Sequence, residues 1–419
     1  MKNLKAQFKL IIYFFIFLSI PTIILAKNLD KFSNAKDVAN YFSGVLSIND
    51  NQYKKSYSYF KSLDNLEESH YTYSQYYQYS LVALGKFKNA TKYSEKLKDK
   101  KLDNFESNLI SAVYYLESKD YKKASLYLKK LEDKNQPGSV QHLLSISLNA
   151  WLDFKNISNL NSGLSILNKI PKRFENLKNI QKTFAHCYFD STKTDAMFKQ
   201  LTSNPDINYS RYYFFHLKYL ISKNQKKKTK KIIEFSLKNN PKNLILNQLK
   251  LDLEKEKVFD NDFDCRNPSD VIAEILYVAS NALAARNNYI ASNFYLNLAK
   301  YLNPNFTSFD TLYAENLFLI QEYKEAKKIY IEIKKKGAVY NWYASKQIAS
   351  IFIKQGKKKK AINSLKKSFE KIINPTTYEI FDYAEFLKNN EKYEESIEYY
   401  TEVLNLIETK NDLYAQVMN

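Results

Sequence analysis

Glycine and proline are scarce along this chain of 419 residues, with 6 Gly and 8 Pro in all. β-Sandwiches and α/β folds need many tight turns, which these two residues usually supply, so both fold classes are disfavoured. Compact domains usually stop near about 250–300 residues, so a chain of this length is expected to form an extended array or several domains. The scarcity favours helices that are joined by short polar corners.

Residues suited to catalysis and metal binding are also few. The chain has four His and two Cys, and it contains no CxxC pair, no Gly-rich phosphate loop and no Ser/His/Asp order. Asp260, Asp262 and Asp264 have the spacing that begins a calcium loop, but Cys265 and Val271 stand where that loop needs Gly and Glu. We therefore expect no metal, no cofactor and no enzymatic activity.

The two cysteines, Cys187 and Cys265, lie in segments that are expected in different parts of the fold. A disulfide between them is an open alternative that the spacing does not favour.

The charge is strongly basic, at +20, yet only four of the 64 basic residues are Arg. Arg is the residue suited to bidentate recognition of phosphates and bases, so its near absence disfavours nucleic acid as a partner. Lys, Asn, Ile, Tyr and Phe are all abundant and share A/T-rich codons, so genomic base composition explains much of the basicity.

Residues 1–26 read as a signal peptide or membrane anchor. Lys2, Lys5 and Lys9 precede an apolar run from Leu10 to Leu25, and Ala26 follows it. We expect an exported protein, either periplasmic or anchored in the inner membrane and facing the periplasm. Contact with the membrane is expected only through residues 1–26, if they remain uncleaved.

A repeat is the main feature of the rest of the chain. Tyr53, Phe87 and Tyr121 stand 34 residues apart, and a small residue follows each of them three positions later. The same step returns at Tyr289, Tyr323, Lys358 and Tyr393. A fixed period in this range indicates helical hairpins that bury their apolar faces by stacking on their neighbours.

With the aromatic residue placed at position 17, units begin at Asp37, Tyr71, Phe105, Ala273, Thr307, Trp342 and Thr377. The pattern within them resembles the tetratricopeptide repeat (TPR) family, which has small residues at positions 8, 20 and 27, bulky ones at 4, 11 and 24, and Pro at 32. The unit from Ala273 matches it with Leu276, Ser280, Leu283, Ser292, Leu296, Ala299 and Pro304. The resemblance implies an all-α fold, an α-α superhelix of about ten hairpins, and it extends to exported α-proteobacterial TPR proteins of unassigned function.

The predicted organisation has three parts after the targeting segment. Residues 37–242 form an N-terminal array that is irregular after 140, residues 243–272 form a helix and a linker loop, and residues 273–419 form a C-terminal array. In the irregular part, hairpins are expected over 153–170, 173–203 and 210–240. The last unit would begin at Asn411 and is incomplete, so we expect either a longer natural product or a partner that covers this end.

TPR arrays bind partners through the first helix of each unit, at positions 2, 5, 9, 12 and 13, and the resemblance carries this role to matching positions here. The predicted groove residues are Tyr277, Asn281, Glu315, Phe318, Tyr343, Lys346, Lys354, Phe381, Glu385 and Lys388. A mixed aromatic and charged lining suits a peptide or an extended protein segment. The Lys and Asn pattern of the TPR subtype that grips a C-terminal carboxylate is absent.

A lysine run, comprising Lys357, Lys358, Lys359 and Lys360, occupies a corner and the first turn of a helix, where backbone N–H groups favour anions. It is a candidate contact for an anionic envelope component, although a solvated corner is the simpler interpretation.

The sequence thus predicts a non-enzymatic protein-interaction scaffold in the bacterial envelope. One alternative is an RNA-binding helical-repeat protein, which would account for the period and the charge. Another is a periplasmic factor that binds anionic lipid or polymer through its lysine clusters.

Overall fold

The protein is all-α, as predicted. Its structure, a computed structural model, describes residues 35–63, 66–131, 136–203, 210–256, 262–407 and 412–418. None of these residues lies in a strand. The targeting segment predicted over 1–26 lies outside the described residues, and no described helix is long and apolar enough to cross a membrane.

The chain divides into two compact units, Met1–Ser111 and Ala112–Asn419. The division falls inside helix α6 (Phe105–Glu117). The segment 243–272, which the sequence suggested as a linker between two arrays, therefore lies within the second unit.

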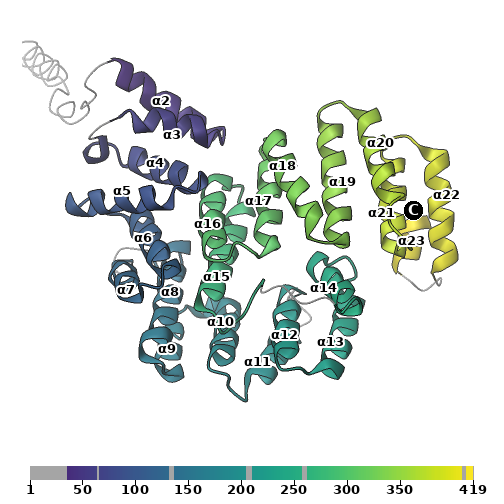
Figure 1. Ribbon diagram of the computed structural model, residues 1–419, viewed down its shortest axis with the longest axis horizontal. Helices are drawn as coiled ribbons and strands as arrows, with labels where there is room; N and C mark the ends of the chain where they lie inside the picture. The colour runs from purple at the N-terminus through teal and green to yellow at the C-terminus, as the bar shows by residue number, and fades with distance from the viewer. Residues whose placement is uncertain are drawn as a thin grey trace, which may run out of the picture. The chain divides into compact units, whose positions relative to one another are not determined.

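Helices follow one another with short connections through the described chain (Figure 1). The first unit holds α2 (Ala35–Asn49), α3 (Tyr53–Lys61), α4 (Tyr71–Ala83), α5 (Phe87–Asp99) and the start of α6. After α6 come α7 (Tyr121–Lys129), α8 (Val140–Ile157), α9 (Leu160–Leu167), α10 (Glu175–Tyr188), α11 (Thr194–Thr202), α12 (Ser210–Ser222), α13 (Lys226–Asn239) and α14 (Leu244–Glu254). The chain continues with α15 (Pro268–Ala284), α16 (Tyr289–Leu302), α17 (Thr307–Leu319), α18 (Tyr323–Ile333), α19 (Ala338–Lys354), α20 (Lys358–Phe369), α21 (Thr377–Lys388), α22 (Tyr393–Leu406) and α23 (Asp412–Met418).

The phase of the repeat is confirmed. The second helix of each regular hairpin begins at the residue that the sequence places at position 17, namely Tyr53, Phe87, Tyr121, Tyr289, Tyr323, Lys358 and Tyr393. Nine pairs of consecutive helices, among them α2/α3 and α21/α22, pack on each other as hairpins in the described residues, in agreement with the predicted TPR-type fold.

Small residues hold the two helices of most regular hairpins in close contact; in the unit from Tyr71, Gln78 stands at position 8 instead. In the hairpin of α15 and α16, Ser280 and Ser292 meet with their Oγ atoms 2.8 Å apart. In the hairpin of α19 and α20, Ala349 and Ala361 occupy the same positions 8 and 20, and both are fully buried. A longer side chain at either position would force the helices apart.

A recurring hydrogen bond joins successive hairpins. Ser80 Oγ donates to Ser56 Oγ at 3.0 Å in the first unit, and Asn316 Nδ2 donates to Ser292 Oγ at 2.8 Å in the second. Both donors stand at position 10 of one repeat and both acceptors at position 20 of the repeat before it. The buried donor groups Ser80 Oγ and Asn316 Nδ2 thereby find acceptors at this packed interface.

The irregular middle of the chain is also built from hairpins, and two of the three predicted ones are present as α10/α11 and α12/α13. The first was predicted wrongly. Helix α8 begins at Val140, because Ser139 caps it by accepting from His142 N, and it ends at Ser158 in the left-handed conformation. The hairpin is therefore α8/α9, and Asp153 lies inside its first helix.

The middle hairpins of the second unit pack against the C-terminal array rather than only against their neighbours in sequence. Helix α8 contacts α15, and α14 lies beside α19 (Figure 1). Gln248 Oε1 on α14 accepts a hydrogen bond from Val339 N at 3.1 Å. Gly337 makes this approach possible, because a Cβ atom there would stand 2.2 Å from Gln248 Oε1.

A cluster of phenylalanine rings fills the space between the middle hairpins and the C-terminal array. Phe215 on α12 lies 4.2 Å from Phe263 and 5.2 Å from Phe184 on α10, measured between ring centroids. Phe306, just before α17, lies 5.7 Å from Phe214. Burial of each such ring contributes about 1.5–3 kcal/mol, so this cluster fixes the middle of the unit to the C-terminal array.

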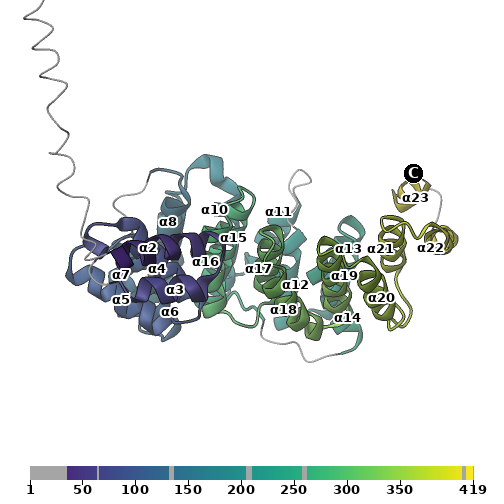
Figure 2. The same ribbon diagram turned by 90° about the horizontal axis from the view of Figure 1, so that it is seen from above.

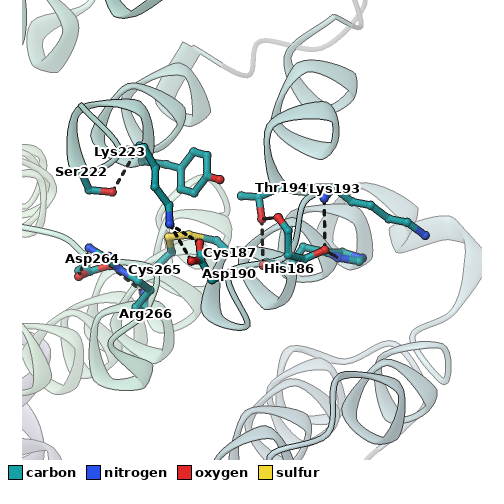
Figure 3. Close-up of polar contacts among 12 residues, drawn as sticks. His186, Cys187, Asp190, Lys193, Thr194, Ser222, Lys223, Asp264, Cys265 and Arg266 are labelled. Carbon is teal, nitrogen blue, oxygen red and sulfur yellow. Dashed lines mark hydrogen bonds and ion pairs between the residues drawn. A yellow bond between two sulfur atoms is a disulfide. The ribbon is translucent and has the colours of Figure 1, made fainter. Parts of the chain in front are cut away.

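A disulfide joins Cys187 on α10 to Cys265, which precedes α15, with Cα atoms 5.9 Å apart. The sequence did not favour this bond, since a separation of 78 residues says nothing about distance in space. Around it, Lys223 donates to Asp190 at 2.7 Å, and Arg266 pairs with Asp264 at 2.9 Å (Figure 3). The bond thus ties a middle hairpin to the start of the C-terminal array.

The short helix predicted after Asn411 is present as α23. It lies beside α22 in both views (Figures 1 and 2). Its Leu413 is buried, whereas Ile397 on α22 remains 63% exposed.

Replacing Ala349 by Leu is expected to lower the free energy of unfolding by about 1–3 kcal/mol, because the added atoms have no room at position 8. Urea denaturation followed by circular dichroism measures this. Ala282→Leu, at an exposed position of α15, is the control and should change it by less than about 0.5 kcal/mol. Equal effects at both sites would contradict the packing described.

Reduction of the disulfide is expected to destabilise the protein by about 2–4 kcal/mol, since the bond closes a long loop and limits the unfolded chain. Thermal unfolding with and without dithiothreitol measures the loss. The Cys187→Ser, Cys265→Ser double variant is the control, and its melting temperature should not respond to the reductant. A wild-type curve that is unchanged by full reduction would show that the bond does not constrain folding.

Candidate functional site

The candidate site is the face of α15, α17, α19 and α21 that carries positions 2, 5 and 9 of each repeat. We call this face the inner wall; its side chains in these positions include Glu274, Tyr277, Asn281, Glu315, Tyr343, Lys346, Phe381 and Glu385. Parts of it are contacted by side chains of α12 and of the α13–α14 connection, as described below. The wall is therefore partly covered by the chain's own middle hairpins.

A buried ion pair covers the wall at α15. Arg211 on α12 donates to both carboxylate oxygens of Glu274, at 2.7 and 2.6 Å. Only 1% of the Glu274 side chain and 18% of the Arg211 side chain are exposed. Burial disfavours the charge on Arg211, but the adjacent carboxylate outweighs it and holds the pKa of Arg211 above its ordinary value. A bidentate pair of this kind fixes the position of α12 on α15.

Tyr277 lies beneath this ion pair. The guanidinium of Arg211 stands 4.0 Å from the centroid of its ring and 4.7 Å from that of Phe306. Burial raises the pKa of Tyr277, the cation of Arg211 lowers it, and the charges of Glu274 and Glu315 raise it. The ring is thus occupied by a cation from the same chain.

Glu315 and Tyr343 meet across two repeats, at the next part of the wall. Tyr343 Oη on α19 donates to Glu315 Oε1 on α17 at 2.5 Å. Burial raises the pKa of Glu315, and the hydrogen bond from Tyr343 offsets this only in part. Both side chains remain half-buried, so this pair is reachable from solvent.

Lys346 and Phe381 lie further along the wall, around Asp382 of α21. Lys346 pairs with Asp382, and Lys242 from the α13–α14 connection reaches the same carboxylate at 3.5 Å. The ammonium of Lys242 also stands 5.0 Å from the centroid of the Phe381 ring. Asp382 is therefore neutralised by lysines of the chain itself.

The remaining predicted residues are not gathered at one point. Glu385 accepts a hydrogen bond from Tyr400 and lies 3.7 Å from Lys388. Phe318 is half-buried against Tyr323, at 5.6 Å between ring centroids. Asn281 and Lys354 lie near the C-terminal ends of α15 and α19 and are exposed.

The lysine run over residues 357–360 lies at the start of α20, as predicted. Three of its side chains make local contacts. Lys358 pairs with Glu391 at 2.6 Å, Lys357 donates to Gln355 at 3.1 Å, and Lys360 stands 4.9 Å from the Phe352 ring centroid. Lys359 is exposed. Binding of an anion here stays a prediction.

A cleft of about 610 Å³ lies between α13 and α14. Its lining combines the apolar side chains of Ile221, Ile233 and Leu253 with charged ones of both signs, Lys226, Lys230, Glu234, Lys250, Glu254 and Glu256. The sequence did not indicate this cleft. In the described part of the chain, no three His, Cys, Asp or Glu side chains gather in a way that would hold a metal ion.

Sequence reasoning missed Arg211, Glu274, Lys242 and Asp382 as parts of the wall. One signal was present, since Arg211 is one of four arginines and stands in an aromatic segment with Tyr212 directly after it. Glu274 stands at position 2, a groove position, but nothing in the sequence pairs it with a residue 63 positions away.

No known family profile matches the sequence, and no curated protein does. Solved structures of low similarity include Naa15/Naa10 bound to HypK-THB, at 12% identity and a TM-score of 0.33, with 87% of this chain and 57% of that one covered. They also include the yeast Tom70, at 13% identity and 0.29, with 91% and 94% covered. A third is the TPR domain of P58(IPK), at 15% identity and 0.26, with 92% and 98% covered.

This chain spans 57% of the length of the Naa15/Naa10 chain that it matches. The low TM-scores show only a loose likeness, so these structures say nothing about the partners of this protein.

The substitution Arg211→Met is expected to lower the free energy of unfolding by about 3–5 kcal/mol, because it leaves the carboxylate of Glu274 buried without its cation. Urea denaturation measures the loss. The double variant Arg211→Met, Glu274→Leu should be more stable than the single one, because no unpaired charge remains. A double variant that is less stable than the single one would contradict this assignment.

Proposed function

We propose that this protein is a non-enzymatic, exported scaffold that binds an extended segment of a partner protein along the inner wall, at α17, α19 and α21. The single observation that carries the proposal is the nature of the wall where it stays accessible. Half-buried Glu315, Tyr343 and Phe318 lie there together with Leu319, which is 58% exposed. Aromatic and apolar side chains next to fixed polar groups suit a peptide segment.

The packing of the unit supports this placement. At α15 the wall is covered by Arg211, and near Phe381 it is approached by Lys242. The stretch around Glu315 lies between these two contacts. Among the described residues, no cation covers the side chains of this stretch, so a partner can reach them. A stacked array supplies a rigid support for such a surface, since each repeat is held by its neighbours.

The disulfide supports the exported location. Bonds of this kind persist in oxidising compartments and are rare in the cytosol, and both cysteines of the chain are committed to one bond. The apolar run predicted to direct export, Leu10 to Leu25, agrees with that placement.

Site-specific photocrosslinking tests the proposed function. p-Benzoylphenylalanine placed at Phe318 on the wall is expected to give protein adducts in intact cells, because a bound segment would lie within reach of it. The same probe at Phe235, which is 58% exposed on α13, is the matched control and should give few. Adducts that are equally abundant at both positions, or absent at Phe318, would refute binding along the wall.

A further inference from the structure

Glu315 differs from the other carboxylates of the inner wall. Glu274 is paired with Arg211, Asp382 with Lys346, and Glu385 lies 3.7 Å from Lys388. Among the described residues, no lysine, arginine or histidine nitrogen forms an ion pair with Glu315, and its hydrogen bond comes from the neutral phenol of Tyr343. A half-buried carboxylate thus stands without a counter-charge.

The absence of a cation is informative in so basic a chain. There are 64 lysines and arginines for 44 acidic residues, so basic side chains outnumber acidic ones. An unpaired charge that is partly removed from water is unfavourable, and an adjacent cation relieves this cost.

A pair of packed tyrosine rings adjoins this carboxylate. Tyr343 on α19 bonds to it, and the ring of fully buried Tyr330 on α18 packs edge-on against that of Tyr343, with centroids 6.1 Å apart. Faces of aromatic rings attract cations, most strongly where water is partly excluded.

The inner wall already binds a cation one repeat earlier, at Glu274. There, the guanidinium of Arg211 lies between the carboxylate of Glu274 and the rings of Tyr277 and Phe306. The site at Glu315 offers a similar combination of one carboxylate and neighbouring tyrosines, and none of the described residues supplies a cation to it.

We propose that Glu315, with Tyr343, forms a receptor for a lysine or arginine side chain of the bound protein segment. This inference rests on the proposed function and adds a chemical class to it: the segment carries a basic residue that enters the wall between α15 and α19. The carboxylate neutralises the charge, and the rings cover the aliphatic part of the side chain.

The probe for the test is a library of random dodecapeptides displayed on phage, selected on the chain from residue 27 onward with its disulfide intact. The most enriched peptide is synthesised with a fluorescent label, together with versions in which each Lys or Arg is replaced by Gln. Fluorescence anisotropy then gives the dissociation constant of each peptide for the wild type and for Glu315→Gln.

Selection is expected to enrich peptides that share one basic position. Glu315→Gln should weaken the parent peptide at least tenfold, and it should change the Gln version by less than twofold, because the interaction is between these two charges. Tyr343→Phe, which keeps the carboxylate and removes its hydrogen bond, should retain the preference for the basic residue. Glu398→Gln, on an exposed position of α22, is the matched control and should have no effect.

Two results would refute the receptor hypothesis. They differ in whether the proposed function still holds. Peptides that compete with crosslinking at Phe318 but bind Glu315→Gln and wild type alike would refute it while the proposed function holds. If no selected peptide competes at Phe318, both the receptor and binding along the wall are refuted.

Discussion

Close contact between small residues at positions 8 and 20 is the constraint on which the rest of the structure depends. Ala349 with Ala361, and Ser280 with Ser292, are fully buried and let two helices approach closely. Large side chains then have room only between one hairpin and the next, so each hairpin is stable only when it is stacked. A constant phase follows from this. As a result, the first helices α15, α17, α19 and α21 present the same repeat positions on one face. The inner wall is a product of that phase.

The second unit uses part of this wall for its own cohesion. The phenylalanine cluster, the Arg211–Glu274 pair and the disulfide all join middle hairpins to the C-terminal array. Burying one charged pair brings little net stability, but it fixes which helices meet, because either charge alone would be costly inside. The accessible stretch near Glu315 is what these contacts leave open. Internal packing and the proposed partner binding are therefore two uses of the same positions in the repeat.

The sequence predicted the local part of this structure and not the long-range part. The aromatic at position 17 marked the start of each second helix, because the repeat is a local pattern. The start of α8 was missed because its cap, Ser139, follows no repeat signal. The contacts of α12 and α14 with the C-terminal array carry no period, so Arg211, Glu274 and the bond between Cys187 and Cys265 were beyond sequence reasoning. Of the predicted groove residues, Glu315 and Tyr343 are brought into direct contact by their phase alone.

A crystal structure of the chain with a selected basic peptide tests the central claim most directly. The account predicts that the nitrogen of a lysine or arginine side chain lies within about 4 Å of the Glu315 carboxylate, beside the ring of Tyr343. It also predicts that Arg211 stays on Glu274, since that pair belongs to the fold. A peptide that is bound elsewhere, or one that enters the wall with an acidic or apolar side chain at Glu315, would contradict it.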